Sequence, residues 1–347
     1  MALSHPVRVL VVDDSAYIRK VLVEMLSANS NIQVVGTARN GRDALEKTAE
    51  LSPDVVTLDL IMPELDGEGY LREQMKRRRL PVIVVSIASE SGEMVVRALE
   101  AGALDFVQKP TALATERIYE IQNDLIAKLL VAAAVEPGKL PGVFSAPPGA
   151  PAKHKAGGTV DAVVLGISTG GPQALSQLIP SLPKDFPAPL AVVLHMPLGY
   201  TALFAKRLDD LSTLEVVEAS EGVEMRPGRV LIAQAGLHLS FLRLPDGRVI
   251  SHLDLRPMDL LHRPAVDVMF QSAAEVYGSR LLGVVMTGMG DDGAAGCAWI
   301  KAQGGTVIAE AEESCVVFGM PRAVIDAGLA DVIAPLDRMA DTIIRHS

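Results

Sequence analysis

The chain has 347 residues, of which 49% are hydrophobic and 21% are charged, and its formal net charge is −10. At about 150 residues per domain, this length predicts two domains, each with its own core. The acidic balance argues against a protein that binds nucleic acid, because such binding depends mainly on Lys and Arg that neutralise phosphates.

Cysteine usage and hydropathy indicate the cellular setting. Cys297 and Cys315 are the two cysteines and form no CxxC pair, so we expect neither a zinc cluster nor a disulfide scaffold. The first apolar run meets Asp13 and Asp14 at once, unlike a signal peptide, and no run approaches the roughly 18 apolar residues of a membrane span. We therefore predict a cytoplasmic protein with no direct membrane insertion.

The first part of the chain alternates β-branched runs with segments of helical spacing. Its expected strands are VRVLVV, IQVVGTA, DVVTLDL, PVIVVS and DFVQK. Each is followed by a segment with apolar residues at helical spacing, which predicts a parallel sheet covered by helices on both faces. Residues 1–130 are therefore expected to form one α/β domain with a doubly wound five-stranded sheet.

Acidic residues stand at the ends of two of these strands. Asp13 and Asp14 follow the first strand, and Asp59 ends the third. The carboxyl ends of central parallel strands meet in one crevice, so these carboxylates should converge. Carboxylates in close contact repel one another unless a cation lies among them, and their oxygen atoms suit Mg²⁺. The sequence therefore predicts a magnesium site.

Two further strand ends carry a hydroxyl and an ammonium group. Ser86 closes PVIVVS and Lys109 closes DFVQK. Both groups could hold phosphoryl oxygens during transfer to a carboxylate. Taken singly, each residue could instead lie on the solvated surface, but five such residues at successive strand ends favour a shared site.

The segments VVDDS, TLDLIMPELDG, PVIVVS and DFVQKP together resemble a two-component receiver domain over about residues 7–128. The resemblance implies a flavodoxin-like fold, with Asp59 as the phosphoacceptor and Asp13 and Asp14 as its partners in binding Mg²⁺. It also implies that Ser86 is the switch hydroxyl and that Lys109 contacts the phosphoryl group.

Phe106 occupies the aromatic position whose rotamer responds to phosphorylation in receiver domains. Plain core packing is the alternative interpretation of this residue.

The chain continues into a segment with a different composition. Residues 136–159 are dense in Pro, Gly and Ala and have no periodicity, which is typical of a semi-flexible linker. We place the linker at 131–159 and a second domain at 160–347. Strand and helix patterns alternate again there, and residues 245–247 predict the turn of a hairpin. We therefore expect a second doubly wound α/β domain with an antiparallel edge.

The stretch LGISTGGP matches G-x-S-x-G around Ser168, between an apolar run and a segment with helical spacing. Such a turn can expose a nucleophilic serine, but glycine-rich turns of this kind also bind phosphates. His195 is the best-placed general base because it ends the strand LAVVL, and a structural histidine at a turn is the alternative. Asp291 and Asp292 are both candidates for the acid that orients it, or could cap the next helix.

The order Ser, His, Asp differs from the order Ser, Asp, His of α/β-hydrolases. Instead GISTGGP, LHMP, HRPAVDVMF, MTGMGDDGAAG and SCVVFGMPRAVI together resemble the catalytic domain of CheB, the chemotaxis protein-glutamate methylesterase, over about residues 160–345. The resemblance implies that Ser168 is the nucleophile, His195 the base and Asp292 the catalytic acid. Backbone amides near Thr169 and Met289 are the expected oxyanion donors, and the esterase needs no cofactor.

The sequence departs from the expected pattern at three positions near this site. Ile167 stands where a small residue is common, Leu194 replaces a frequent Gln, and Asp291 replaces a common Asn. None of these departures removes a member of the expected triad.

The resemblance also implies the biological role. The enzyme would hydrolyse glutamyl methyl esters on methyl-accepting chemotaxis receptors, and deamidate specific glutamines, after a chemotaxis histidine kinase phosphorylates Asp59. Two alternatives stay open. One is a receiver joined to a non-catalytic docking or signalling domain, and the other is the same hydrolase acting in a receptor pathway outside chemotaxis.

Overall fold

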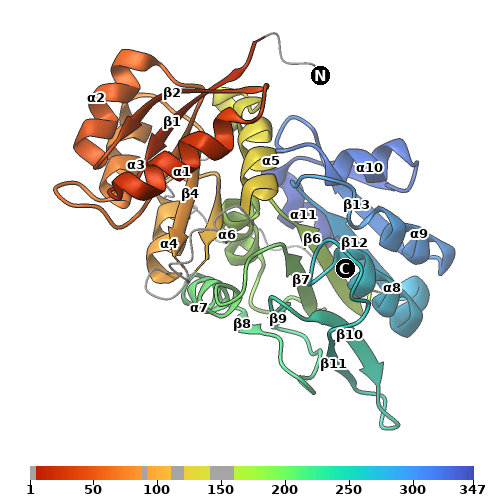
Figure 1. The fold of residues 1–347 in the computed structure, drawn as a ribbon. Helices are drawn as coiled ribbons and strands as arrows, with labels where there is room; N and C mark the ends of the chain where they lie inside the picture. Colours follow the sequence, from red (N-terminus) through yellow and green to blue (C-terminus); the bar gives the residue numbers. More distant parts are fainter. Residues whose placement is uncertain (1–4, 88–91, 111–120, 141–159) are drawn as a thin grey trace. The chain divides into compact units, whose positions relative to one another are not determined.

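The computed structural model describes residues 5–87, 92–110, 121–140 and 160–347 (Figure 1). Its contacts divide the chain into two compact units, residues 1–145 and 146–347. The expected domain boundaries after residues 130 and 159 stay predictions, because most of the expected linker lies outside the described residues.

The first unit contains one parallel five-stranded sheet in the order β2-β1-β3-β4-β5. Its strands are β1 (Val7–Val12), β2 (Ile32–Ala38), β3 (Val55–Leu58), β4 (Val82–Ile87) and β5 (Asp105–Lys109). Its helices are α1 (Ala16–Ser27), α2 (Gly41–Leu51), α3 (Gly67–Arg77), α4 (Gly92–Glu100), α5 (Gln122–Ala133) and the 3-10 helix η2 (Pro137–Lys139). This strand order is the flavodoxin-like one, which confirms the predicted fold.

Polar caps begin the first three helices of this unit. Ser15, Asn40 and Asp66 precede α1, α2 and α3, and the side chain of each accepts a hydrogen bond from a backbone N–H of the first turn. Such a cap stabilises a helix by about 1 kcal/mol. Ser15 also lies two residues after Asp13, so the cap fixes the turn that carries the acidic residues.

The second unit contains a seven-stranded parallel sheet in the order β14-β13-β12-β6-β7-β9-β8. Its strands are β6 (Ala162–Ile167), β7 (Leu190–Leu194), β8 (Glu215–Glu218), β9 (Arg229–Ile232), β12 (Leu281–Val285), β13 (Thr306–Glu310) and β14 (Val332–Ala334). Its helices are α6 (Gly171–Ser181), α7 (Thr201–Leu211), α8 (Val266–Tyr277), α9 (Ala294–Ala302), α10 (Met320–Asp326), α11 (Leu336–His346) and the 3-10 helix η3 (Gly278–Arg280). Contacts join α6 to α7 and α11, and α9 to α8 and α10, as expected for a doubly wound fold with two helical layers.

The predicted hairpin forms, but not at an edge of the large sheet. Strands β10 (His238–Arg243) and β11 (Val249–Asp254) pair with each other as a separate antiparallel sheet. All pairs in the seven-stranded sheet are parallel, so the expectation of an antiparallel edge is wrong. The physical reason is packing: Leu239 and Phe241 point into the core beside Phe270 of α8 and are buried there.

The direction of strand succession reverses between β6 and β12, and ligands of such sheets bind at this switch point. Ile167 of β6 pairs with Leu194 of β7, so the next residues, Ser168 and His195, leave the sheet side by side. Within the described ranges, no helix has the length and hydropathy needed to cross a membrane.

Candidate active site and phosphoacceptor site

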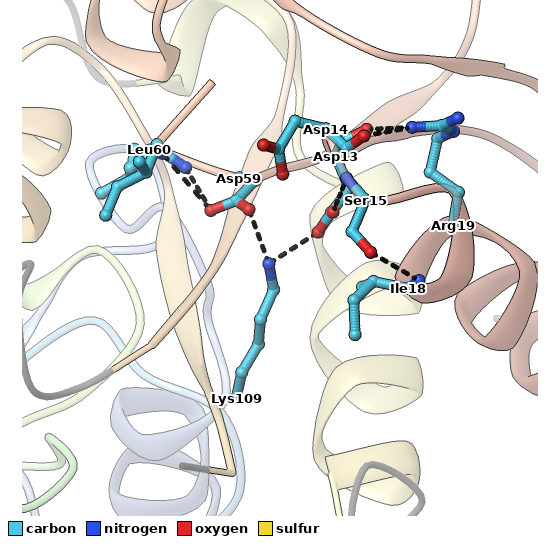
Figure 2. A network of polar contacts seen from close by, with 9 residues as sticks. Asp13, Asp14, Ser15, Ile18, Arg19, Asp59, Leu60 and Lys109 are labelled. Atoms are coloured by element: carbon cyan, nitrogen blue, oxygen red, sulfur yellow. Dashed lines mark hydrogen bonds and ion pairs between the residues drawn. The ribbon is translucent and has the colours of Figure 1, made fainter. Parts of the chain in front are cut away.

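The three acidic residues of the first unit converge as predicted. Ligand oxygen atoms of Asp13, Asp14 and Asp59 lie within 4.8 Å of one another. Figure 2 shows Lys109 between two of them, with Nζ 2.6 Å from Asp13 Oδ2 and 2.8 Å from Asp59 Oδ2. Three carboxylates at this spacing form the all-oxygen donor set that suits Mg²⁺.

Burial shapes the charges in this cluster. Asp13, Asp59 and Lys109 are buried, whereas Asp14 is exposed. Burial, reinforced by the neighbouring Asp59 carboxylate, raises the pKa of Asp13 to about 6 against the opposing charge of Lys109. Burial alone would lower the pKa of Lys109, but the two carboxylates raise it above its ordinary value, so the ammonium group stays charged.

Backbone hydrogen bonds orient the two buried carboxylates. Asp13 Oδ1 accepts from the Ser15 N–H at 2.9 Å, and Asp59 Oδ1 accepts from the N–H of the next residue at 2.7 Å. In each carboxylate the other oxygen faces Lys109 (Figure 2). Arg19, which sequence reasoning did not single out, holds the turn by donating to the carbonyl oxygens of residues 13 and 14 at 2.7 and 2.9 Å.

The two remaining receiver residues lie in the adjacent strands. Ser86 is buried near the end of β4 and pairs in register with Gln108 of β5. Phe106 is buried in β5, with Lys128 Nζ 6.0 Å from its ring centroid. Their roles in a phosphorylation switch stay predictions.

In the second unit, Ser168 lies in the turn between β6 and α6, where the sequence motif predicted it. The turn uses a positive φ at Gly170 (+81°) and not at Ser168. A Cβ at Gly170 would lie 2.9 Å from Val316 Cβ, and one at Gly166 would lie 2.3 Å from Val266 Cγ1. The glycines of the motif therefore permit a left-handed turn and close packing, and Ser168 itself has no positive φ.

The loop after β12 holds this turn. The Ser168 N–H donates to the Thr287 carbonyl at 2.9 Å, and Thr287 Oγ1 donates to the Thr169 carbonyl at 3.0 Å. A Cβ at Gly288 would lie 2.8 Å from Ser168 Cβ, so the backbone leading to Met289 passes directly beside the serine. The two segments that carry the predicted oxyanion donors, Thr169 and Met289, thus meet at Ser168.

The structure selects Asp292 as the partner of His195. His195 Nε2 lies 2.8 Å from Asp292 Oδ2, and the two side chains are only 7% and 14% exposed. Asp291 is exposed, and its carbonyl accepts from the Ala294 N–H. Of the two acids that the strand-end pattern left open, Asp292, the one that the family resemblance implies, contacts the histidine.

This contact determines which imidazole nitrogen can act as a base. The hydrogen bond from His195 and two backbone amides hold the pKa of Asp292 below its usual value, although burial alone would raise it. An ionised carboxylate only accepts hydrogen bonds, so Nε2 carries the proton. His195 Nδ1 is buried and has no hydrogen-bond partner among the described residues, which leaves its lone pair free to take a proton.

Asp292 and Asp267 form a reciprocal pair of helix caps. Asp292 caps α8, which contains Asp267, and Asp267 caps α9, which begins just after Asp292. Asp292 Oδ2 accepts from the Val266 N–H at 2.8 Å, and Oδ1 accepts from the Asp267 N–H at 2.9 Å, at the start of α8. Asp267 Oδ1 accepts in return from the N–H groups of Gly293 and Gly296 at 2.9 and 2.6 Å, at the start of α9. The sequence signal for this role is the position of Asp267 within HRPAVDVMF, because an acid in the first turn of a helix is typical of a cap.

Glu310, the last residue of β13, is a further residue that the sequence patterns did not single out. It is fully buried, accepts from the Thr287 N–H at 2.8 Å and from Ser314 Oγ at 2.8 Å. Burial raises its pKa. The Thr287 carbonyl in turn accepts from the Ser168 N–H, so Glu310 holds the position of Ser168 through Thr287. The available signal was an acid that follows the apolar residues Val, Ile and Ala within the strand TVIAE.

Comparisons with known proteins follow the same division of the chain. The CheB methylesterase family matches residues 163–343, and the response regulator receiver domain family matches residues 9–120. Protein-glutamate methylesterase/protein-glutamine glutaminase 5 of Myxococcus xanthus is 52% identical over 354 residues, which cover 100% of this chain and 99% of the relative. The chain belongs to the CheB methylesterase family.

Other members of this family agree over the same span. Protein-glutamate methylesterase/protein-glutamine glutaminase of Symbiobacterium thermophilum is 46% identical and matches 98% of this chain and 97% of its own length. The crystal structure of the Thermotoga maritima CheB methylesterase catalytic domain is 48% identical with a TM-score of 0.52, covering 53% of this chain and 97% of that domain. The resemblance to CheB in the second half of the sequence and to receiver domains in the first is confirmed.

Proposed function

We propose that this chain hydrolyses glutamyl methyl esters on chemotaxis receptors, and deamidates glutamines there, under the control of phosphorylation at its receiver domain. The observation that carries the proposal is the His195–Asp292 contact beside the Ser168 turn, in a chain whose relatives are protein-glutamate methylesterases and protein-glutamine glutaminases.

The site supports an acyl-enzyme mechanism. His195 Nδ1 takes the proton of Ser168 Oγ as this oxygen attacks the ester carbonyl carbon, and Asp292 stabilises the imidazolium that forms. The amides of Thr169 and Met289 stabilise the oxyanion, at about 3 kcal/mol of barrier each. The imidazolium returns the proton to the leaving methoxide, methanol departs, and a water activated by His195 then releases the glutamate and restores Ser168. With glutamine, ammonia leaves in place of methanol.

The proposed ester hydrolysis uses no metal, whereas phosphorylation of the receiver domain requires one. Asp13, Asp14 and Asp59 would hold Mg²⁺, whose charge offsets that of the incoming phosphoryl group. Asp59 accepts the phosphoryl group from a chemotaxis histidine kinase. Lys109, which already lies 2.8 Å from Asp59, provides a positive charge for its oxygens.

Methanol release tests the proposed activity. The substrate is a methylated receptor fragment, and the proteins are wild type, Ser168→Ala and wild type treated with a small phosphodonor. We expect release by the wild type, an increase on phosphorylation, and loss in Ser168→Ala. Normal release by Ser168→Ala would exclude Ser168 as the nucleophile.

The same assay separates the alternative functions. Absence of release by the wild type, with the receptor still bound, would favour a docking or signalling protein. Release from another methylated receptor-like protein, but not from a chemotaxis receptor, would favour a pathway outside chemotaxis.

A further inference from the structure

The loop between β11 and α8, residues 255–263, exposes several apolar side chains. Leu261 is 91% exposed and Met258 is 69% exposed, and Leu255 and Leu260 are exposed as well. Single exposed apolar residues are common on protein surfaces, but a group of four within one short loop is typical of an interaction surface.

Hydrogen bonds hold this loop at both ends. The buried His238 accepts at Nδ1 from the Ala265 N–H at 3.2 Å, so its Nε2 donates to the Pro257 carbonyl at 2.9 Å. Within the loop, the Arg263 guanidinium donates to the Met258 carbonyl at 3.1 Å. The apolar side chains are therefore presented by an organised backbone, which lowers the entropy cost of binding a partner.

The loop adjoins the catalytic histidine directly. The His262 ring stacks on the His195 ring, with centroids 3.9 Å apart and an angle of 16° between the planes. Leu261 is the preceding residue, so the most exposed apolar side chain of the loop lies one residue from a group in contact with the triad.

A second exposed leucine borders the same loop. Leu198, 64% exposed, follows His195 in the loop after β7. A Cβ at Gly236 would lie 2.5 Å from Leu198 Cδ2, and the Gly236 N–H donates to the Arg263 carbonyl at 2.9 Å. Exposed apolar side chains thus come from two loops beside His195. Loop 255–263 contacts His195 through His262, and the loop with Leu198 follows His195 in the chain.

Arg263 adds a positive charge to this surface. Its Nε is buried without a hydrogen-bond partner, and among the described residues its guanidinium forms no ion pair with a carboxylate. A bound partner does not reach the buried Nε, but Arg263 as a whole is only half-buried and its Nη2 contact with the Met258 carbonyl is exposed, so a partner's carboxylate can pair with the accessible guanidinium nitrogens. A protein substrate that carries glutamates supplies such groups.

We propose that loop 255–263 and Leu198 bind the protein segment next to the esterified glutamate, an amphipathic segment with apolar side chains and at least one carboxylate. This inference rests on the proposed function. The apolar side chains of the substrate bury Leu261 and Met258, and its carboxylate pairs with Arg263. These contacts hold the substrate while the ester reaches Ser168, and a small ester makes none of them.

The test compares two substrates on the phosphorylated full-length chain. One is a methylated cytoplasmic fragment of a chemotaxis receptor, and the other is p-nitrophenyl acetate. We expect Met258→Ser combined with Leu261→Ser to lower kcat/KM for the receptor about 10-fold or more, through KM, because two buried apolar contacts are lost. Hydrolysis of p-nitrophenyl acetate should stay within about two-fold of wild type, since its kcat/KM depends on the triad alone.

The matched control replaces two exposed apolar residues outside the loop, Leu242→Ser with Ile333→Ser, and should leave both reactions unchanged. Three results would overturn the inference: an equal loss on both substrates, no loss on either, or a rise in activity of the unphosphorylated loop variant, which would mean that the loop binds the receiver. A wild type that hydrolyses p-nitrophenyl acetate but releases no methanol from the receptor would overturn the proposed function as well.

The charge of Arg263 is tested separately. The KM of the wild type for the receptor should rise with salt concentration, since the pairing is electrostatic. We expect Arg263→Gln to raise this KM and to weaken its dependence on salt, and Arg263→Lys to restore both in part. An unchanged salt dependence in Arg263→Gln would contradict the proposed pairing.

Discussion

Among single residues, the orientation of the His195 imidazole determines which of its nitrogen atoms acts in the proposed mechanism. His195 turns Nε2 toward Asp292 and leaves Nδ1 without a partner in the described structure. The serine protease template uses the opposite assignment, in which Nδ1 binds the acid and Nε2 serves the serine. Either nitrogen can act as a base, provided that a carboxylate holds the proton on the other one.

Asp292→Asn should therefore lower kcat about 10³- to 10⁴-fold, as the loss of the triad carboxylate does elsewhere. Asp292 accepts three hydrogen bonds on two oxygens, whereas an amide has one oxygen and no negative charge for the imidazolium. Methanol release from methylated receptor measures the effect. Asp291→Asn is the matched control and should stay within about two-fold of wild type, and a comparable loss there would contradict the choice of Asp292.

Glu310→Gln should stabilise the protein more at pH 8 than at pH 5. Burial raises the pKa of Glu310 in the folded state. In the unfolded chain this carboxyl has a pKa of about 4.3, so it loses its proton at a lower pH than in the folded protein. The free energy of unfolding of the wild type therefore falls as the pH rises from the unfolded pKa to the folded pKa. Each unit of difference between the folded and unfolded pKa of Glu310 corresponds to about 1.4 kcal/mol of the free energy of unfolding. The glutamine retains an acceptor for the Thr287 N–H and has no proton to lose.

Thermal unfolding at the two pH values measures this effect, with the exposed Glu313→Gln as the control. A difference between Glu310→Gln and wild type that does not change with pH would show that Glu310 has the same pKa in both states.

At the scale of elements, the site is assembled from strand ends and helix starts. Strand pairing brings the ends of β6 and β7 together, and the capping pair Asp267 and Asp292 joins the starts of α8 and α9. Asp292, the proposed catalytic acid, is thus also a helix cap, so its position depends on two helices that pack against each other.

Asp267→Ala should destabilise the protein by about 1–2 kcal/mol, because the Gly293 and Gly296 N–H groups lose their acceptor. The loop that carries Asp292 should also loosen, so we expect a lower kcat with little change in KM. Asp267→Asn should restore both the stability and kcat, since Oδ1 of Asp267 alone accepts the hydrogen bonds from Gly293 and Gly296. Urea unfolding and hydrolysis of a small ester measure the two effects. Destabilisation with an unchanged kcat would limit Asp267 to a structural role.

At the scale of the whole molecule, two chemistries share one chain. The receiver cluster and the esterase site lie in separate compact units, each at the strand ends of its own parallel sheet. In the proposed function, phosphorylation at Asp59 acts on Ser168 by shifting a population between less and more active states.

Metal removal should affect the response to phosphorylation but not the basal esterase activity. With EDTA present, a small phosphodonor should no longer stimulate methanol release, while the basal rate should persist because the triad needs no metal. Asp59→Asn should give the same result without EDTA. Loss of the basal rate in EDTA would contradict a metal-free esterase.

Removal of residues 1–150 should raise the basal rate above that of the unphosphorylated full chain, as expected if the receiver restrains the esterase. A rate that is unchanged or lower would exclude restraint by the receiver.

The amino-acid sequence alone predicts the two α/β halves, the strand-end positions of Asp59, Ser168 and His195, and the family. Local patterns carry this information, since apolar periodicity and strand-end position depend on neighbouring residues. The separate position of the hairpin, the contact between Asp292 and His195, and the support from Asp267 and Glu310 are visible only in the folded structure, although the family resemblance had already implied Asp292 as the acid. Each depends on distances between residues far apart in the chain, about a hundred positions for His195 and Asp292, and strand order and packing set those distances.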